Sequence, residues 1–97
     1  AFRLKFSARA LREIGKAQAW HELQSLGLGE EFLAAIELQL KRLEQAPLLY
    51  AEVIPKVRRA LLPRFPYALF FSVQDDLIHI LAVLHDARNP QKWPKAR

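Results

Sequence analysis

The chain has 97 residues, of which 52% are hydrophobic and 10% aromatic, and this length and composition fit one folded domain and argue against disorder. It contains no cysteine, which excludes disulfides, thiol catalysis and cysteine-ligated zinc. No apolar run reaches the roughly 18 residues of a membrane span, and the charged N-terminus does not resemble a secretory signal, so we expect a cytoplasmic protein.

The formal net charge of +5 belongs to the second half of the chain. Residues 1–52 hold seven basic and seven acidic side chains, whereas residues 53–97 hold eight basic and three acidic ones. This asymmetry favours a polyanion or an acidic protein as the partner of the second half. The alternative is a basic domain without such a partner.

The N-terminal segment predicts a strand followed by a helix. Residues 2–6, FRLKF, alternate apolar and polar side chains, which is the period of a half-buried strand. Ser7 is a candidate N-cap for a helix over residues 8–26, in which the apolar pattern drifts and allows a bend near Gly15. The GLG sequence at residues 27–29 ends this helix.

The strongest helical pattern covers residues 30–46. Acidic residues at its start and basic residues near its end complement the helix dipole. One apolar stripe should face a sheet, and it consists of Phe32, Ile36, Leu40 and Leu43.

The second half predicts three strands in quick succession after a loop over residues 47–55. The strands cover residues 56–62, 66–73 and 77–85, and the short connections between them require an antiparallel meander. Together with the first strand and the helical hairpin, they predict one α+β domain with a single sheet that carries the hairpin on one face. The tail over residues 86–97 is irregular, with Trp93 as its anchor.

The order of these elements and three stretches of sequence resemble the ParE/RelE superfamily of bacterial toxins from type II toxin–antitoxin modules. The stretches are AWHELQSLGLGEEF at residues 19–32, VRRALLPRFPYALFF at residues 57–71 and LAVLHDARNPQKW at residues 81–93. The resemblance covers nearly the whole chain. Its most specific parts are Arg58 with the following RFPY and the final histidine, arginine, proline and tryptophan.

The resemblance implies one of two toxic mechanisms. ParE-like members inhibit DNA gyrase by protein contact, and RelE-like members cut messenger RNA on the ribosome. Both are neutralised by a cognate antitoxin, in this case ParD-like or similar with an acidic segment, and a toxin–antitoxin hetero-oligomer is possible. The ending HDARNPQKW has no tyrosine after His85 and is more like ParE-type members, so gyrase inhibition is the first hypothesis and RNA cleavage the second. A third is an inactive member that only binds antitoxin.

The two mechanisms assign different roles to the same residues. A metal-free ribonuclease needs an acid or base and cations around the phosphate, and the candidates are Arg58, Arg64, His85 and Arg88. A surface that contacts a protein target would instead use arginine and tryptophan, and the candidates are Arg58, Arg59, Arg64, Arg88 and Trp93.

Several of these residues also have purely structural interpretations. Arg64 lies in a proline-flanked bend, where it could neutralise backbone carbonyls or Asp86, and His85 could pair with the same carboxylate. We expect Tyr67 to belong to the core.

The other aromatic candidates are expected to be structural or solvated. We expect His79 to be partly buried, Trp20 to pack inside the helical hairpin and His21 to be solvated. Three scattered histidines without an acidic cluster predict no metal site, and no motif predicts a cofactor.

Overall fold

The computed structural model describes residues 2–87 and 89–95, so the candidate residue Arg88 lies outside the described residues. The elements along the chain are β1 (Arg3–Phe6), α1 (Ala8–Gln24), α2 (Leu28–Gln45), the 3₁₀ turn η1 (Pro47–Leu49), β2 (Glu52–Ile54), β3 (Val57–Leu61), β4 (Tyr67–Gln74), β5 (Leu77–His85) and the 3₁₀ turn η2 (Pro90–Lys92). No helix in these ranges is long and apolar enough to cross a membrane.

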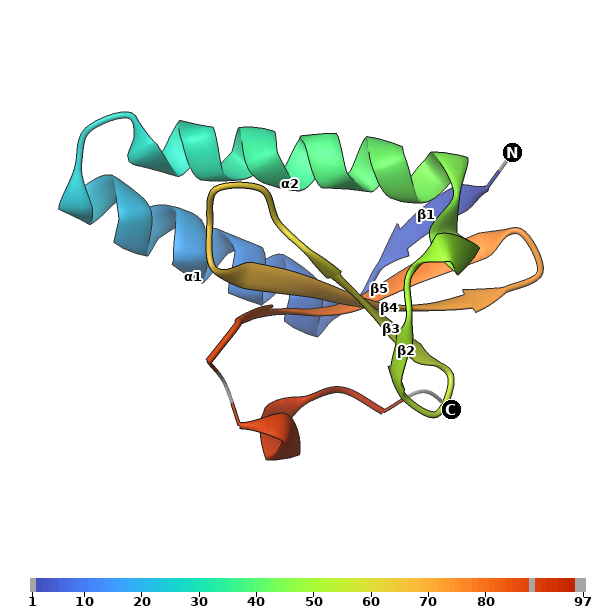
Figure 1. The fold of residues 1–97 in the computed structure, drawn as a ribbon. Helices are drawn as coiled ribbons and strands as arrows, with labels where there is room; N and C mark the ends of the chain where they lie inside the picture. The colour runs from blue at the N-terminus through green and yellow to red at the C-terminus, as the bar shows by residue number, and fades with distance from the viewer. Residues whose placement is uncertain (1, 88, 96–97) are drawn as a thin grey trace.

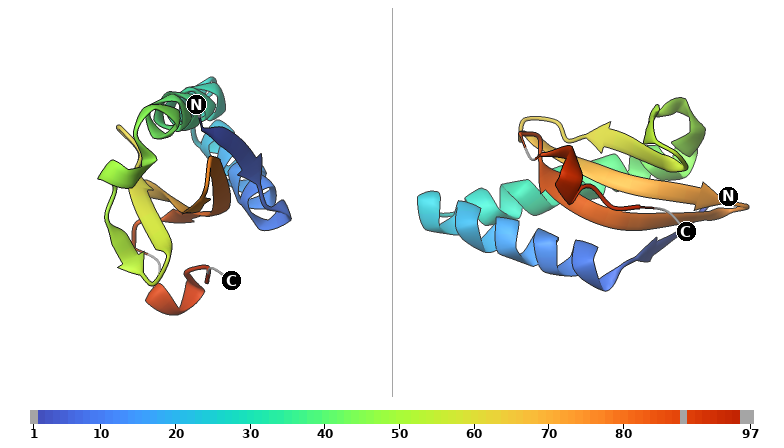
Figure 2. Two further views of the ribbon diagram at one scale, coloured as in Figure 1. Left: turned by 90° about the vertical axis from the view of Figure 1, so that its right-hand side faces the viewer. Right: turned by 90° about the horizontal axis from the view of Figure 1, so that it is seen from below.

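The sheet has the strand order β1-β5-β4-β3-β2. Strand β1 runs parallel to β5, and all the other pairs are antiparallel, so the predicted α+β class and meander are confirmed. Both helices lie on one face of the sheet, and the C-terminal tail lies on the other (Figure 1). Figure 2 shows the same three layers from two further directions.

The strand β2 was not predicted, because its three residues lie between prolines in a segment that resembles a loop. It pairs with β3 around a turn at Pro55 and Lys56, and Lys56 has a positive φ of 64°, as the residue after proline has in a type II turn. Glu52 stabilises this turn, because its carboxylate accepts a 3.0 Å hydrogen bond from the backbone N–H of Lys56.

Ser7 caps α1 as predicted. Its Oγ accepts a 2.9 Å hydrogen bond from the N–H of Ala10 and donates one of 2.9 Å to the carbonyl of Leu81, so the cap also ties the helix to β5. The helix then continues through Gly15 as one α-helix.

Helix α2 begins two residues earlier than predicted, because the preceding helix supplies its cap. Gly27 has φ 87°, in the left-handed region that favours glycine, and its N–H and that of Gly29 donate to the carboxylate of Glu22 at 3.0–3.1 Å. These backbone hydrogen bonds hold the pKa of the Glu22 carboxyl below its ordinary value.

The main core lies between the helices and the sheet, as predicted. Phe32, Ile36 and Leu43 are buried, and Leu40 packs at the margin of the same cluster. The sheet residues that belong to this cluster include Leu69, Phe71 and Ile80, which are completely shielded from solvent.

A smaller core lies on the opposite face of the sheet. It consists of Val57, Ala68, Phe70, Ala82 and Leu84, with Trp93 packed against it. The ring of Trp93 lies 5.2 Å from that of Phe70, so the predicted anchoring of the tail by Trp93 is confirmed.

A β-bulge in β5 changes which side chains face the helices. Phe70 pairs with Ala82 and Phe71 with Ile80, so Leu81 is the extra residue on β5. The alternation beyond this point shifts by one position, and His85 therefore faces the helical side together with its strand partner Tyr67.

Candidate functional site

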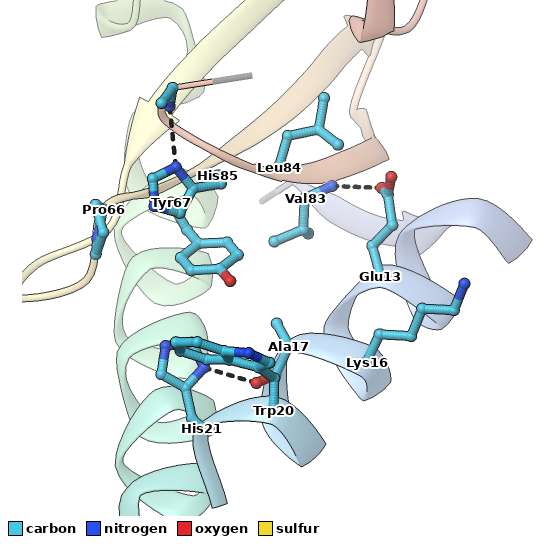
Figure 3. Close-up of a pocket in the computed structure, with 11 residues that line it drawn as sticks. Glu13, Lys16, Ala17, Trp20, His21, Pro66, Tyr67, Val83, Leu84 and His85 are labelled. Carbon is cyan, nitrogen blue, oxygen red and sulfur yellow. Dashed lines mark hydrogen bonds between the residues drawn. The ribbon is translucent and has the colours of Figure 1, made fainter. Parts of the chain in front are cut away.

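A groove lies between α1 and the ends of β4 and β5. Its volume is about 730 Å³. We call it the hairpin groove, and its lining residues are Glu13, Lys16, Ala17, Trp20, His21, Pro66, Tyr67, Val83, Leu84, His85 and Ala87. Figure 3 shows the rings of His85 and Tyr67 on one side of it and those of Trp20 and His21 on the other.

His21 is buried in the wall of this groove, so the prediction that it is solvated was wrong. It is 5% exposed, and its Nδ1 lies 2.6 Å from the carbonyl oxygen of Ala17 one helical turn earlier. Its ring stacks on Phe32 at 4.8 Å and meets Phe65 edge-on at 5.1 Å. The backbone hydrogen bond satisfies one ring nitrogen, which allows the imidazole to join an aromatic cluster.

Trp20 lies on the rim of the groove and is 55% exposed, so the prediction that it packs inside the hairpin was also wrong. Leu23 and Leu26 are 84% and 95% exposed near the turn between the helices. The exposed tryptophan on the rim and the two exposed leucines of the same helical hairpin make this end of the molecule apolar on its surface.

The polar groups near the sheet end of the groove are mostly engaged. The carboxylate of Glu13 accepts 2.9 Å and 3.1 Å hydrogen bonds from the N–H of Val83 and from Arg9. His85 accepts a 3.0 Å hydrogen bond at Nδ1 from the N–H of Ala87, and its ring lies 5.2 Å from that of Tyr67. The neutral imidazole of His85 therefore carries its proton on Nε2.

Arg58 is fixed by its surroundings. Its Nη1 donates to the carbonyl oxygens of Tyr50 and Leu48 at 2.5 Å and 3.4 Å, and its Nη2 lies 3.6 Å from the carboxylate of Glu52. These contacts hold η1 and β2 against β3. The guanidinium therefore has a structural role in this arrangement.

Arg64 lies in the loop between β3 and β4 and is well exposed. Its φ of 69° is in the left-handed region, which residues other than glycine rarely adopt. Its Nη2 contacts the carboxylate of Glu31, in the first turn of α2, at 2.8 Å. The partner is therefore Glu31, whereas the sequence had suggested backbone carbonyls or Asp86.

The structure does not bring all the candidate ribonuclease residues to one place. Arg58 on β3 pairs with Phe71 of β4, and His85 on β5 pairs with Tyr67 of β4. The two partners are four residues apart along β4, and β3 and β5 lie on opposite sides of that strand. With about 3.3 Å per residue and about 4.8 Å between strands, the Cα atoms of Arg58 and His85 are roughly 16 Å apart. The guanidinium of Arg58 is also held toward η1 and β2, so the structure does not place it beside His85.

Arg59 and Trp93 meet on the face of the sheet that carries the tail. The guanidinium of Arg59 lies over the indole of Trp93, 5.5 Å from the ring centroid. Arg59 pairs in register with Phe70, against which Trp93 also packs. Two of the predicted target-binding residues are thus in direct contact.

No group of three or more histidine, aspartate or glutamate side chains in residues 2–87 and 89–95 is placed to hold a metal ion.

The exposed ion pair between Arg3 and Asp76 ties β1 to the turn before β5, with N–O distances of 3.1 Å. The Arg3 guanidinium lowers the pKa of the Asp76 carboxyl, first through these hydrogen bonds.

Comparisons with known proteins identify the family. Residues 4–90 match the family model described as the ParE toxin of the type II toxin–antitoxin system parDE. No curated protein sequence matches the chain. Among solved structures, the chromosomal ParDE toxin–antitoxin system from P. aeruginosa is 26% identical, with a TM-score of 0.71 over 87% of this chain and 95% of that chain.

Two E. coli structures share the fold at lower identity. The intact RelBE toxin–antitoxin complex is 20% identical, with a TM-score of 0.64 over 91% of this chain and 100% of that chain. The isolated RelE toxin is also 20% identical with a TM-score of 0.64, over 94% of this chain and 90% of that chain. The family model covers most of the sequence, and the chain therefore belongs to the ParE toxin family of type II toxin–antitoxin systems.

Proposed function

We propose that this ParE family toxin acts in the cytoplasm by binding DNA gyrase and that a cognate antitoxin, ParD-like or similar, neutralises it in a toxin–antitoxin complex. The observation that carries the proposal is the match of residues 4–90 to the ParE family, together with the likeness to a ParDE system. The likeness to RelE is at 20% identity and extends to the fold alone.

The placement of the candidate residues supports a mechanism of protein contact over RNA cleavage. Arg58 is engaged by two carbonyls and Glu52, and Arg64 by Glu31. The imidazole of His85 lies beside Tyr67 at the groove, far along the sheet from Arg58. General acid–base catalysis requires such groups within hydrogen-bond reach of the same phosphodiester.

The hairpin groove supports an antitoxin with an acidic amphipathic segment. Its floor is apolar and aromatic, and Trp20 stands exposed on its rim. Lys16 contributes a positive charge there, whereas Arg9 and the Val83 amide already engage the carboxylate of Glu13. An amphipathic helix would place its apolar side chains in the groove and its carboxylates toward Lys16.

RNA cleavage by a RelE-like mechanism is the second candidate, and a double substitution separates the two. We expect Arg64→Ala with His85→Ala to leave growth arrest on induction unchanged, because neither side chain belongs to the surface around Arg59 and Trp93, which we call the tail surface. Because His85 lines the groove proposed for the antitoxin, the circular dichroism spectrum and melting temperature of the purified variant serve as the control for folding. Loss of growth arrest with a retained fold, together with messenger RNA fragments from the parent toxin, would establish the ribonuclease instead.

Co-expression tests the antitoxin part of the proposal. We expect the product of the neighbouring gene to raise the soluble yield of the toxin and its melting temperature, because it covers the hairpin groove. A toxin that binds no such product and is equally stable alone would contradict this part.

A further inference from the structure

Arg59 differs from the other half-buried arginines in the described part of the chain. Arg9 contacts Glu13 and a backbone carbonyl, and Arg58 contacts Glu52 and two carbonyls. Arg59 makes no side-chain hydrogen bond or ion pair within residues 2–87 and 89–95, and its guanidinium instead lies over the ring of Trp93. Its charge is partly removed from water, and no anion among the described residues neutralises it, so the guanidinium remains available to a carboxylate of a partner.

The tail holds Trp93 in position beneath Arg59. The guanidinium of Arg9 donates to the carbonyl of Lys92, and the N–H of Trp93 donates to the carbonyl of Pro90 at 3.0 Å. The indole packs on Phe70, and the neighbouring Pro94 is buried. Figure 1 shows the tail crossing beneath the sheet on the side away from the helices. The guanidinium therefore rests on a fixed platform, which reduces the entropy lost on binding.

The surroundings of Arg59 are apolar and positive. Leu61, two residues along β3 on the same face, is 54% exposed. Lys92 and Lys95 are exposed in the tail, which has no acidic residue between positions 87 and 95. Arginine and tryptophan are the residues that most often dominate protein interfaces.

We propose that Arg59, placed over the ring of Trp93, binds an aspartate or glutamate side chain of the toxin's protein target, with Leu61 as the apolar neighbour of that contact. The inference rests on the proposed function and names the chemistry that the target presents at this surface. The planar guanidinium offers two parallel N–H groups to a carboxylate, which a lysine cannot reproduce.

A protein carboxylate fits this surface better than nucleic acid. Proteins that bind single strands stack bases on exposed aromatic rings, but Arg59 covers one face of Trp93 and Phe70 packs on the same ring. The remaining features are the guanidinium of Arg59 beside the exposed Leu61, with Lys92 and Lys95 exposed in the tail, and they suit a carboxylate on an acidic and partly apolar protein surface.

Growth arrest on induction tests the inference whatever the target is. We expect Arg59→Glu to raise colony counts at least about 100-fold and Arg59→Lys to raise them about 10-fold, because lysine keeps the charge but loses the fork. The matched control is Arg42→Glu, which reverses an exposed charge on α2 far from the tail and should leave arrest intact. Antitoxin binding of each variant monitors folding. Full arrest by Arg59→Glu would overturn the inference.

Two purified assays separate the possible anions. A carbodiimide links the lysine introduced by Arg59→Lys to a carboxylate in contact with it, so we expect a crosslink to gyrase through residue 59. Inhibition of gyrase by the Arg59→Lys variant without such a crosslink would contradict the inference. Binding of a labelled oligothymidylate that is lost in Arg59→Ala would assign the site to phosphate and also overturn it. Wild-type arrest without gyrase inhibition would refute the proposed target, and the growth assay alone would then decide the role of Arg59.

Discussion

Ile36→Ala tests the packing of the hairpin on the sheet. Ile36 is 3% exposed and belongs to the main core. The substitution removes three carbon groups, which at about 0.8 kcal/mol each represent about 2.4 kcal/mol of lost burial. A cavity term adds to this wherever the surroundings do not relax, so we expect a loss of about 2–5 kcal/mol in the free energy of unfolding.

The control is Leu38→Ala on the same helix, where the side chain is 45% exposed. Urea unfolding followed by circular dichroism should show a loss of about 1 kcal/mol or less for this control. For a domain of this size, a loss of about 3 kcal/mol lowers the melting temperature by about 12–24 °C. A loss below about 0.5 kcal/mol for Ile36→Ala would mean that α2 presents a different face to the sheet.

Three further predictions concern the hairpin. Gly15→Ala should raise the free energy of unfolding by about 0.5–1 kcal/mol, because a Cβ there meets no atom within 4 Å. Gly29→Ala should instead lower it by about 1–3 kcal/mol, because its Cβ would lie 2.9 Å from the Gln18 carbonyl oxygen. Equal effects of the two substitutions in urea melts would contradict the close contact of the helices. The pKa of Glu22 is lowered by its backbone hydrogen bonds, so its contribution to stability is fully present above about pH 4.3 and is lost as the pH falls through the lower folded-state pKa. The difference in melting temperature between wild type and Glu22→Gln should therefore be constant from pH 5 to 7 and shrink below about pH 4, and a constant difference down to pH 2 would refute the linkage. Trp20→Ala should weaken antitoxin binding about 30-fold in calorimetric titration with little change in stability, and unchanged affinity would place the antitoxin elsewhere.

The parts of the fold that local chemistry determines could be predicted from the sequence. The N-cap at Ser7, the stripe that contains Phe32 and Ile36, and the short turns of the meander each depend on residues close together in the chain. These signals give the order of elements, and the order gives the α+β class.

The arrangement of the groove depends on tertiary contacts that have no local signal. The bulge at Leu81 shifts the alternation of side chains along β5 and turns His85 toward the helices. Nothing in the sequence of β5 distinguishes it from a strand without a bulge. His21 resembles a solvated residue on a charged helix, but its contact with the Ala17 carbonyl lets the ring pack against Phe32.

The tail surface was predictable in composition but not in geometry. Arginine and tryptophan near the C-terminus suggest an interface, and the structure adds that Arg59 and Trp93 are in contact while Arg58 is engaged by η1 and β2. Neighbouring arginines on a strand face opposite sides of the sheet, and only the pairing of β3 with β2 and β4 shows which one is held by the fold.

The most direct test of the account is the activity of the purified toxin on gyrase compared with its activity on messenger RNA. We expect the toxin to inhibit supercoiling of relaxed plasmid by gyrase, the antitoxin to restore it, and ribosome-bound messenger RNA to stay intact at the same toxin concentration. Cleavage of the messenger RNA without any effect on supercoiling would contradict the account.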